Sequence, residues 1–259
     1  MTALAVSPNS AHLAIFTSSL SLRLYTLPAP SVISTNVHAS KHIPRAHDAP
    51  VHVCTIDPAS ALLASGSADG IVKVHDLRRG HLTHLFRGHG GIVSALRFHY
   101  RPGVTPGSWE SMQLVTASAD TRVRVFDLAA GSGTSAPVAV LEGHVSVPRG
   151  LGMSHDARYV VSGGRDAVVL IWDTRPAAEG KKGKKATPVL VKTIPVLERV
   201  EALGVLEAEH SDGRLRFYTG GQKGIVRVWD AWEAKVLATF GEEVEGEEAE
   251  ESRQILDVM

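Results

Sequence analysis

One short pattern recurs along the chain at nearly fixed spacing, and it restricts the possible folds more than any other feature. In each copy a histidine precedes an aspartate in a turn, and a second aspartate follows seven residues later. The histidines are His47, His89 and His144, and the aspartate pairs are Asp69/Asp76, Asp120/Asp127 and Asp166/Asp173. The distance from histidine to turn aspartate is 22 residues in the first and third copies and 31 in the second, where a segment rich in Pro and Gly intervenes. Such self-similarity predicts a repeat architecture.

Each copy consists of short runs in which apolar and polar residues alternate. Val72 and Val74 show the alternation in one copy, and Val123 and Val125 show it in the next. A period of two is typical of strands, and the Asp69-Gly70 pair is a signal for a tight hairpin. Gly and Pro recur too often for a long helical stripe. Each unit is therefore expected to form a four-stranded antiparallel sheet, which makes the fold all-β.

The order GH, then about 22 residues, then Asp, then a WD-like pair resembles the WD40-repeat family, in which one repeat of about 40–45 residues forms one propeller blade. The resemblance implies a partial WD40 β-propeller of about five blades over residues 1–241. Its units are expected at 1–44, 45–85, 86–138, 139–192 and 193–241. A seven-bladed ring needs roughly 280–315 residues. We therefore expect either a fragment of a longer protein or a ring that a partner completes.

In WD40 repeats, Trp, Ser or Thr, the GH histidine and the turn aspartate form a hydrogen-bonded tetrad, which satisfies a buried imidazole on both ring nitrogens. One copy here has all four members: His144, Ser162, Asp166 and Trp172. Two copies have another residue at the Trp position: His47, Ser65, Asp69 and His75, and then His89, Thr116, Asp120 and Phe126. The fifth unit keeps Trp229, has Lys223 at the turn position and lacks GH. These departures predict blades of unequal stability, as does Pro148 in a first strand.

Composition excludes several classes of protein. The chain balances 27 Lys and Arg against 27 Asp and Glu, so its net charge gives no general attraction to nucleic acid or anionic membranes. No apolar run approaches the roughly 18 residues that a membrane span needs. The single cysteine, Cys54, cannot form an intrachain disulfide or a cysteine-based zinc site and is predicted to be a small buried apolar residue. The repeat accounts for the recurring histidines, so we expect no metal site.

The Ser, His and Asp sets contain the residue types of a catalytic triad. Their recurrence in successive units favours a structural role, and no G-x-S-x-G, P-loop or G-x-G-x-x-G motif is present. We therefore expect no enzyme activity, no cofactor and no small-molecule substrate. Ser162 is predicted to be buried.

Two segments concentrate charge. The loop 175–188 contains Lys181, Lys182, Lys184 and Lys185, which suit either a solvated insertion or contact with phosphate. The tail 242–259 carries seven glutamates and is expected to be disordered. Separately, WDTR (172–175), with Arg175, resembles the box by which some WD40 proteins dock onto the adaptor of cullin-RING ubiquitin ligases. A substrate receptor of such a ligase is therefore an alternative function.

Stretches outside the generic motif resemble a narrower family, the U3 small nucleolar RNA-associated WD40 subunits of the UtpB complex. They are DGIVKVHDL, THLFRGHGGIVSAL, LEGHVSVPRGL, GGRDAVVLIWD and KTIPVLERVEALGV. The last of these includes TIPVLERVE, which stands where ordinary repeats carry GH. The resemblance implies a non-catalytic scaffold of the small-subunit processome in the nucleolus, which supports rRNA processing in ribosome biogenesis. Its implied partners are other UtpB and processome proteins, with pre-rRNA and U3 snoRNA bound mostly through the complex. Candidate contacts on the propeller faces are Arg122, Arg165, Gln222 and the lysine loop.

Overall fold

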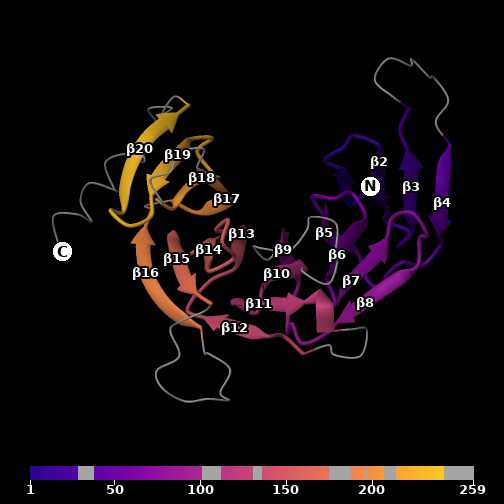
Figure 1. Cartoon of the computed structure of the whole chain (residues 1–259), viewed down its shortest axis with the longest axis horizontal. Coiled ribbons are helices and arrows are strands. Elements are labelled where there is room, and N and C mark those ends of the chain that lie inside the picture. The colour runs from indigo at the N-terminus through magenta and orange to yellow at the C-terminus, as the bar shows by residue number, and fades with distance from the viewer. Residues whose placement is uncertain are drawn as a thin grey trace.

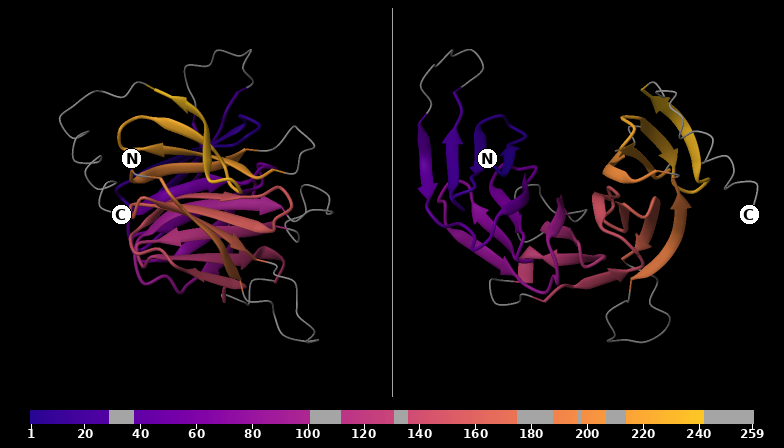
Figure 2. Two further views of the ribbon diagram at one scale, coloured as in Figure 1. Left: turned by 90° about the vertical axis from the view of Figure 1, so that its left-hand side faces the viewer. Right: turned by 180° about the vertical axis from the view of Figure 1, so that it is seen from behind.

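The structure is a computed structural model that describes residues 1–28, 38–100, 112–130, 136–174, 188–196, 198–206 and 214–241. Within these ranges, twenty strands form five four-stranded antiparallel sheets. The remaining regular element is a short 3-10 turn, η2 (Leu128–Ala130). No helix in the described part of the chain is long and apolar enough to cross a membrane. The all-β prediction is confirmed, and the sheets follow one another around an open arc, as in a partial propeller (Figures 1 and 2).

Every sheet is a meander of four consecutive strands. The first contains β1 (Ala3–Val6), β2 (His12–Phe16), β3 (Leu22–Thr26) and β4 (Ala39–Ile43). The second contains β5 (Val51–Ile56), β6 (Leu62–Ser67), β7 (Val72–Asp76) and β8 (Leu82–Phe86). The third contains β9 (Val93–Tyr100), β10 (Met112–Ser118), β11 (Arg122–Asp127) and β12 (Ala139–Glu142). The fourth contains β13 (Pro148–Met153), β14 (Tyr159–Gly164), β15 (Val168–Asp173) and β16 (Val189–Pro195). The fifth contains β17 (Val200–Leu206), β18 (Arg216–Gly221), β19 (Val226–Asp230) and β20 (Lys235–Phe240).

The sheet boundaries differ from the unit boundaries expected from the motif. β12 pairs with β11, although the expected division at 138/139 assigns it to the next unit. β16 pairs with β15 from end to end, although the division at 192/193 cuts through it. The chain instead passes from sheet to sheet in the loops that hold His47, His89 and His144. Motif spacing could not reveal this, because a strand belongs to the sheet of its hydrogen-bonded neighbour.

The first strands of the sheets lie side by side along the inner side of the arc, in the order β1, β5, β9, β13 and β17 (Figure 1). Apolar side chains fill the space between consecutive sheets. Phe16 and Leu63 belong to the cluster between the first two sheets. Between the second and third sheets, Phe86 stacks on Phe126 with their ring centroids 4.4 Å apart. The remaining clusters lie between the third and fourth and between the fourth and fifth sheets. The core is therefore shared between sheets.

A bulge near the start of the inner strand recurs in four sheets. In each of them one residue of the inner strand has no partner in the register with the second strand. These extra residues are His52, Ser94, Arg149 and Glu201. Pro148 is the first residue of β13, where proline is tolerated because it is at the end of the ladder.

Gly150 provides a test of the packing between the fourth and fifth sheets. A methyl group at Gly150 would lie 2.4 Å from Leu203 Cβ and 2.7 Å from Leu203 N. Because the obstacle includes backbone, G150A is expected to lower the free energy of unfolding by about 1–3 kcal/mol. The control is G220A in β18, where the added methyl group would lie 3.7 Å from its nearest neighbour, Ala202 Cβ. G220A should therefore lower the free energy of unfolding by less than about 0.5 kcal/mol. Urea denaturation measures both values, and equal losses would contradict this packing.

Candidate functional site

The fourth sheet brings together the four residues of the complete motif. His144 Nδ1 donates to Asp166 Oδ2 at 2.9 Å, and His144 Nε2 lies 2.8 Å from Ser162 Oγ. Trp172 Nε1 donates to the same hydroxyl oxygen at 3.2 Å. The side chains of His144 and Asp166 are 1% and 2% exposed. This buried chain of hydrogen bonds ties the loop before β13 to strands β14 and β15.

The third sheet contains a buried arginine that the sequence analysis did not identify. His89 Nε2 lies 2.7 Å from Thr116 Oγ1, as expected of the motif. However, Arg124 Nη1 lies 2.6 Å from His89 Nδ1 and 2.7 Å from Asp120 Oδ2. A guanidinium can only donate, so Nδ1 accepts and Nε2 carries the proton. In His144 the proton is on Nδ1 instead, because the neighbour there is a carboxylate. Phe126 occupies the Trp position of this sheet.

Burial and the Arg124 charge lower the pKa of His89 to about 4. Burial also acts on Asp120 and by itself would raise the pKa of its carboxyl group. Backbone N–H groups of Gly90 and Arg122 and the Arg124 guanidinium donate to this carboxylate, and together they hold its pKa below the ordinary value. The imidazole is therefore neutral beside a permanent ion pair.

The second sheet does not bring Asp69 to His47. His47 Nε2 lies 2.8 Å from Ser65 Oγ, but its Nδ1 is buried without a hydrogen-bond partner. Asp69 accepts a backbone N–H in its own turn. His75, at the Trp position, is also buried with an unpartnered Nδ1. Burial, followed by the charge of Lys73, lowers the pKa of both histidines to about 4.

The fifth sheet keeps half of the motif and replaces the rest by an ion pair. Trp229 Nε1 donates to Thr219 Oγ1 at 2.9 Å, as Trp172 donates to Ser162 in the fourth sheet. Glu198 and Arg227 form a salt bridge in which their side chains are 8% and 19% exposed. Arg124 and Arg227 both lie four residues after the turn position. A cation at that offset is a signal that sequence inspection could have used.

The structure gives no support to the hydrolase interpretation of the Ser, His and Asp sets. Ser162 is fully buried, as predicted, and its hydroxyl is engaged by Trp172. Cys54, predicted to be buried, is only partly buried, and this burial raises the pKa of its thiol to about 12. Within the described ranges, no group of three or more His, Cys, Asp or Glu is arranged to hold a metal ion.

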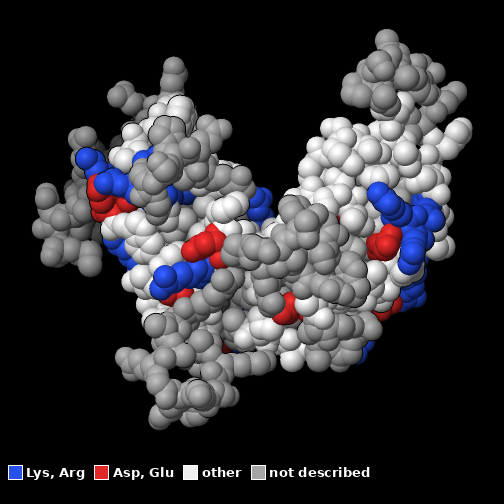
Figure 3. Space-filling model, viewed as in Figure 1, with Lys and Arg blue, Asp and Glu red and all other residues white. Residues whose placement is uncertain are grey.

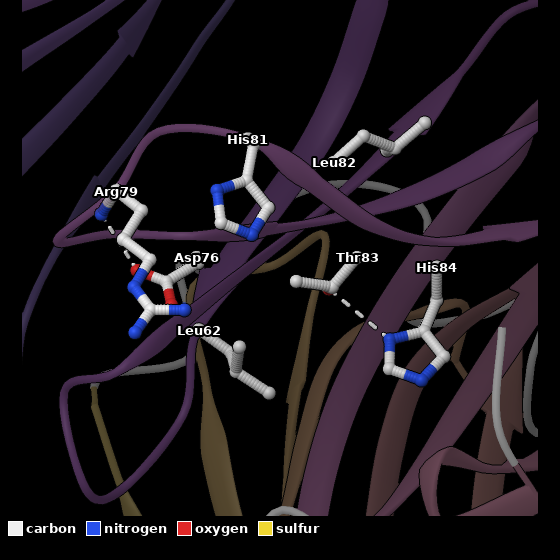
Figure 4. Close-up of a pocket in the computed structure, with 7 residues that line it drawn as sticks. All are labelled: Leu62, Asp76, Arg79, His81, Leu82, Thr83 and His84. Atoms are coloured by element: carbon white, nitrogen blue, oxygen red, sulfur yellow. Dashed lines mark hydrogen bonds between the residues drawn. The ribbon is translucent and has the colours of Figure 1, made fainter.

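One cavity of about 400 Å³ lies at the outer edge of the second sheet (Figure 4). Its lining residues are Leu62, Asp76, Arg79, His81, Leu82, Thr83 and His84. Asp76 caps its turn by accepting the Arg79 backbone N–H, and Thr83 donates to the Val74 carbonyl. His84 contacts Thr83 Oγ1 and the Leu128 carbonyl. These hydrogen bonds hold the turn and the edge strand in place. Among the residues that line the cavity, none is an activated nucleophile.

The exposed candidates for partner contact lie in local ion pairs. Arg122 Nε contacts Glu142 Oε1 at 2.8 Å, and Arg165 Nε contacts Glu201 Oε1 at 3.1 Å. Arg149, which sequence reasoning missed, contacts Glu201 Oε2 at 2.9 Å. Lys/Arg and Asp/Glu side chains accordingly form small mixed groups on the face shown in Figure 3.

Gln222 is exposed next to Lys223. Several sequence predictions lie outside the described residues: Lys181, Lys182, Lys184, Lys185, Arg175 and the tail 242–259.

Comparison with known families gives matches to the WD domain, G-beta repeat, at residues 39–76, 80–127 and 135–173. The chain is a WD40-repeat protein. Each match begins at or just before the outer strand of one sheet and ends with the third strand of the next. The WD40 repeat and the propeller blade are therefore offset by one strand, which accounts for the boundary differences above.

Individual relatives extend the similarity beyond these matches. Transducin beta-like protein 3 from Bos taurus is 37% identical over 191 residues, which cover 71% of this chain and 21% of the relative. The same protein from Rattus norvegicus is 34% identical over 74% of this chain and 22% of its own length. U3 small nucleolar RNA-associated protein 13 from Saccharomyces cerevisiae is 29% identical over 95% of this chain and 27% of its own length. The chain thus spans about a quarter of these relatives.

The unequal motifs predict unequal losses on removal of the central hydroxyl group. S162A leaves two buried groups without their partner, His144 Nε2 and Trp172 N–H, so unfolding should become easier by about 2–4 kcal/mol. The matched variant S65A deprives only His47 of a side-chain partner and should lose about 1–2 kcal/mol. Urea denaturation of both variants tests the difference. A loss in S65A as large as that in S162A would show that Trp172 gains nothing from its hydrogen bond.

The buried histidines predict an acid-sensitive fold. The pKa of His47, His75 and His89 is about 4 in the folded chain and ordinarily 6.5. The unfolded chain therefore binds these protons first, and the free energy of unfolding should fall as the pH drops from about 6.5 to 4, by roughly 1–3 kcal/mol per histidine. Urea denaturation midpoints between pH 6.5 and pH 4 measure this loss of stability. The control R124L removes the cation beside His89 and should reduce the loss, whereas a flat wild-type profile would contradict the assignment.

Proposed function

We propose that this chain is a non-catalytic WD40 scaffold in ribosome biogenesis. In the proposed role it belongs to the UtpB complex of the small-subunit processome, works in the nucleolus and supports processing of pre-rRNA. Its partners are other processome proteins, and U3 snoRNA is reached through the assembled complex.

The observation that carries the proposal is the extent of one match. Generic WD40 repeats account for parts of residues 39–173, whereas U3 small nucleolar RNA-associated protein 13 aligns over 95% of the chain. Transducin beta-like protein 3 has the higher identity over a shorter stretch. The similarity therefore reaches the fifth sheet, where the generic motif is replaced by the Glu198–Arg227 ion pair.

The site geometry supports a scaffold for a separate reason. In the fourth sheet, which has the complete set, the Ser, His and Asp groups that an enzyme would present to a substrate are buried and hydrogen-bonded to one another. By contrast, the exposed side chains of Arg122 and Arg165 lie in ion pairs at the surface. Catalysis needs reacting groups at a surface or cavity, and this arrangement uses them to hold loops in place.

Affinity purification of the tagged chain from nuclear extract tests the proposal, after circular dichroism has shown that the chain is folded. Co-recovery of UtpB subunits with U3 snoRNA is the expected result. Recovery of a cullin-RING adaptor without this RNA would overturn the proposal and favour the alternative that rests on WDTR. The control R175A should leave the processome partners unchanged, whereas a ligase receptor should lose its adaptor.

A further inference from the structure

The bulges of four inner strands place one extra side chain per sheet at the same point of the arc; the first of these, His52, is exposed, and the other three are half-buried. A bulge redirects the side chain of its extra residue. The positions in four consecutive sheets are His52, Ser94, Arg149 and Glu201, each near the start of an inner strand. These strands line the inner side of the arc (Figure 1). Ser94 and Pro148 are joined between neighbouring sheets by a hydrogen bond from Ser94 Oγ to the Pro148 carbonyl.

Two arginines share one carboxylate at this edge. Arg149 Nε contacts Glu201 Oε2, and Arg165 Nε contacts Glu201 Oε1, at 2.9 and 3.1 Å. The side chains of Arg149 and Arg165 are 37% and 43% exposed. One negative charge therefore faces two positive charges, and each arginine uses Nε for the contact. In the described part of the chain, no hydrogen bond occupies their Nη groups.

Neighbouring positions add positive charge. The turn that carries Asp69, Asp120 or Asp166 in the preceding sheets carries Lys223 in the fifth, and Lys223 is exposed. Gly221 lies against Glu198, so this turn packs beside the loop that holds exposed Arg199.

The nearby acidic groups do not cancel this charge at the surface. Glu198 is buried with Arg227, and Asp166 is 2% exposed and bonded to His144. We name four cations the basic rim: half-buried Arg149 and exposed Arg165, Arg199 and Lys223. Glu201 is the half-buried carboxylate among them.

We infer that the basic rim contacts the phosphate backbone of single-stranded RNA directly. The inference rests on the proposed function and goes beyond it, since RNA there is reached through the complex. Adjacent guanidinium forks, whose Nη groups form no hydrogen bond with another described residue, match the bidentate geometry of a phosphate. An acidic protein segment is the competing ligand, and a relative associated with small nucleolar RNA favours RNA.

Salt dependence of RNA binding tests the contact. Anisotropy of a fluorescein-labelled uridine 20-mer, titrated with the full chain at several NaCl concentrations, gives the slope of log K against log salt. Each lost phosphate contact lowers the slope by about 0.7 for a single strand, so R149Q/R165Q should lower it by about 1.4. The control R23Q/R78Q removes the same charge from exposed positions of the first and second sheets and should leave the slope unchanged.

A second variant separates RNA contact from a purely structural ion pair. E201Q removes the carboxylate that neutralises one arginine, so it should bind the 20-mer severalfold more tightly than the wild type. A structural pair would give no such gain. A wild-type slope in R149Q/R165Q, or no gain in E201Q, would overturn the inference. So would displacement by poly-glutamate that depends on the two arginines while RNA binding does not.

Failure of this contact is distinguishable from failure of the proposed function. If the purification from nuclear extract recovers U3 snoRNA while the variants bind the 20-mer as the wild type does, the chain reaches RNA through other subunits. If the variants behave as expected but UtpB subunits are absent from the purification, the RNA contact stands and the assignment to the processome fails.

Discussion

Face-to-face packing of neighbouring sheets is the interaction on which the rest of this structure depends. Each apolar cluster draws its members from two sheets, so a blade separated from its neighbours would expose most of its core. Burial of apolar surface is the largest favourable term in folding. Close contact of β17 with Gly150 and Gly152 shows how tightly the inner strands approach. The first and fifth sheets each have a neighbouring sheet on one side. Apolar side chains are exposed in both of these end sheets, as Leu4 and Val6 in β1 and Tyr218 in β18 show.

Polar groups hold the loops between the sheets in place against this apolar core. The polar group buried at the motif position has different partners in each of four sheets. His144 is satisfied by a serine and a carboxylate, and His89 by a threonine and an arginine. His47 keeps one partner and leaves a buried nitrogen unpaired. The fifth sheet uses the Glu198–Arg227 pair. Since an unsatisfied buried polar group costs free energy, the second sheet is the least well stabilised of these by its motif.

Positions that depart from the repeat motif give one sheet a surface that differs from those of the others. A position that holds an aspartate in three sheets bears Lys223 in the fifth, and the loss of GH admits Glu198 and Arg199. The change removes an internal hydrogen-bond network and leaves cations exposed near the bulged Arg149–Glu201 pair. A scaffold assembled from equivalent sheets can in this way distinguish one part of its surface from the others.

The sequence by itself determined the all-β class, the repeated sheets and the identity of the motif residues, because alternation and turn signals are local and recur with each repeat. The burial of Ser162 also followed from the repeat. Only the tertiary structure decided that β12 and β16 belong to the preceding sheets, that Arg124 lies between His89 and Asp120, and that Asp69 does not reach His47. It also joined Arg149 to Arg165 through Glu201. These contacts join residues far apart in sequence or depend on side-chain rotamers, so a one-dimensional pattern contains no distance for them.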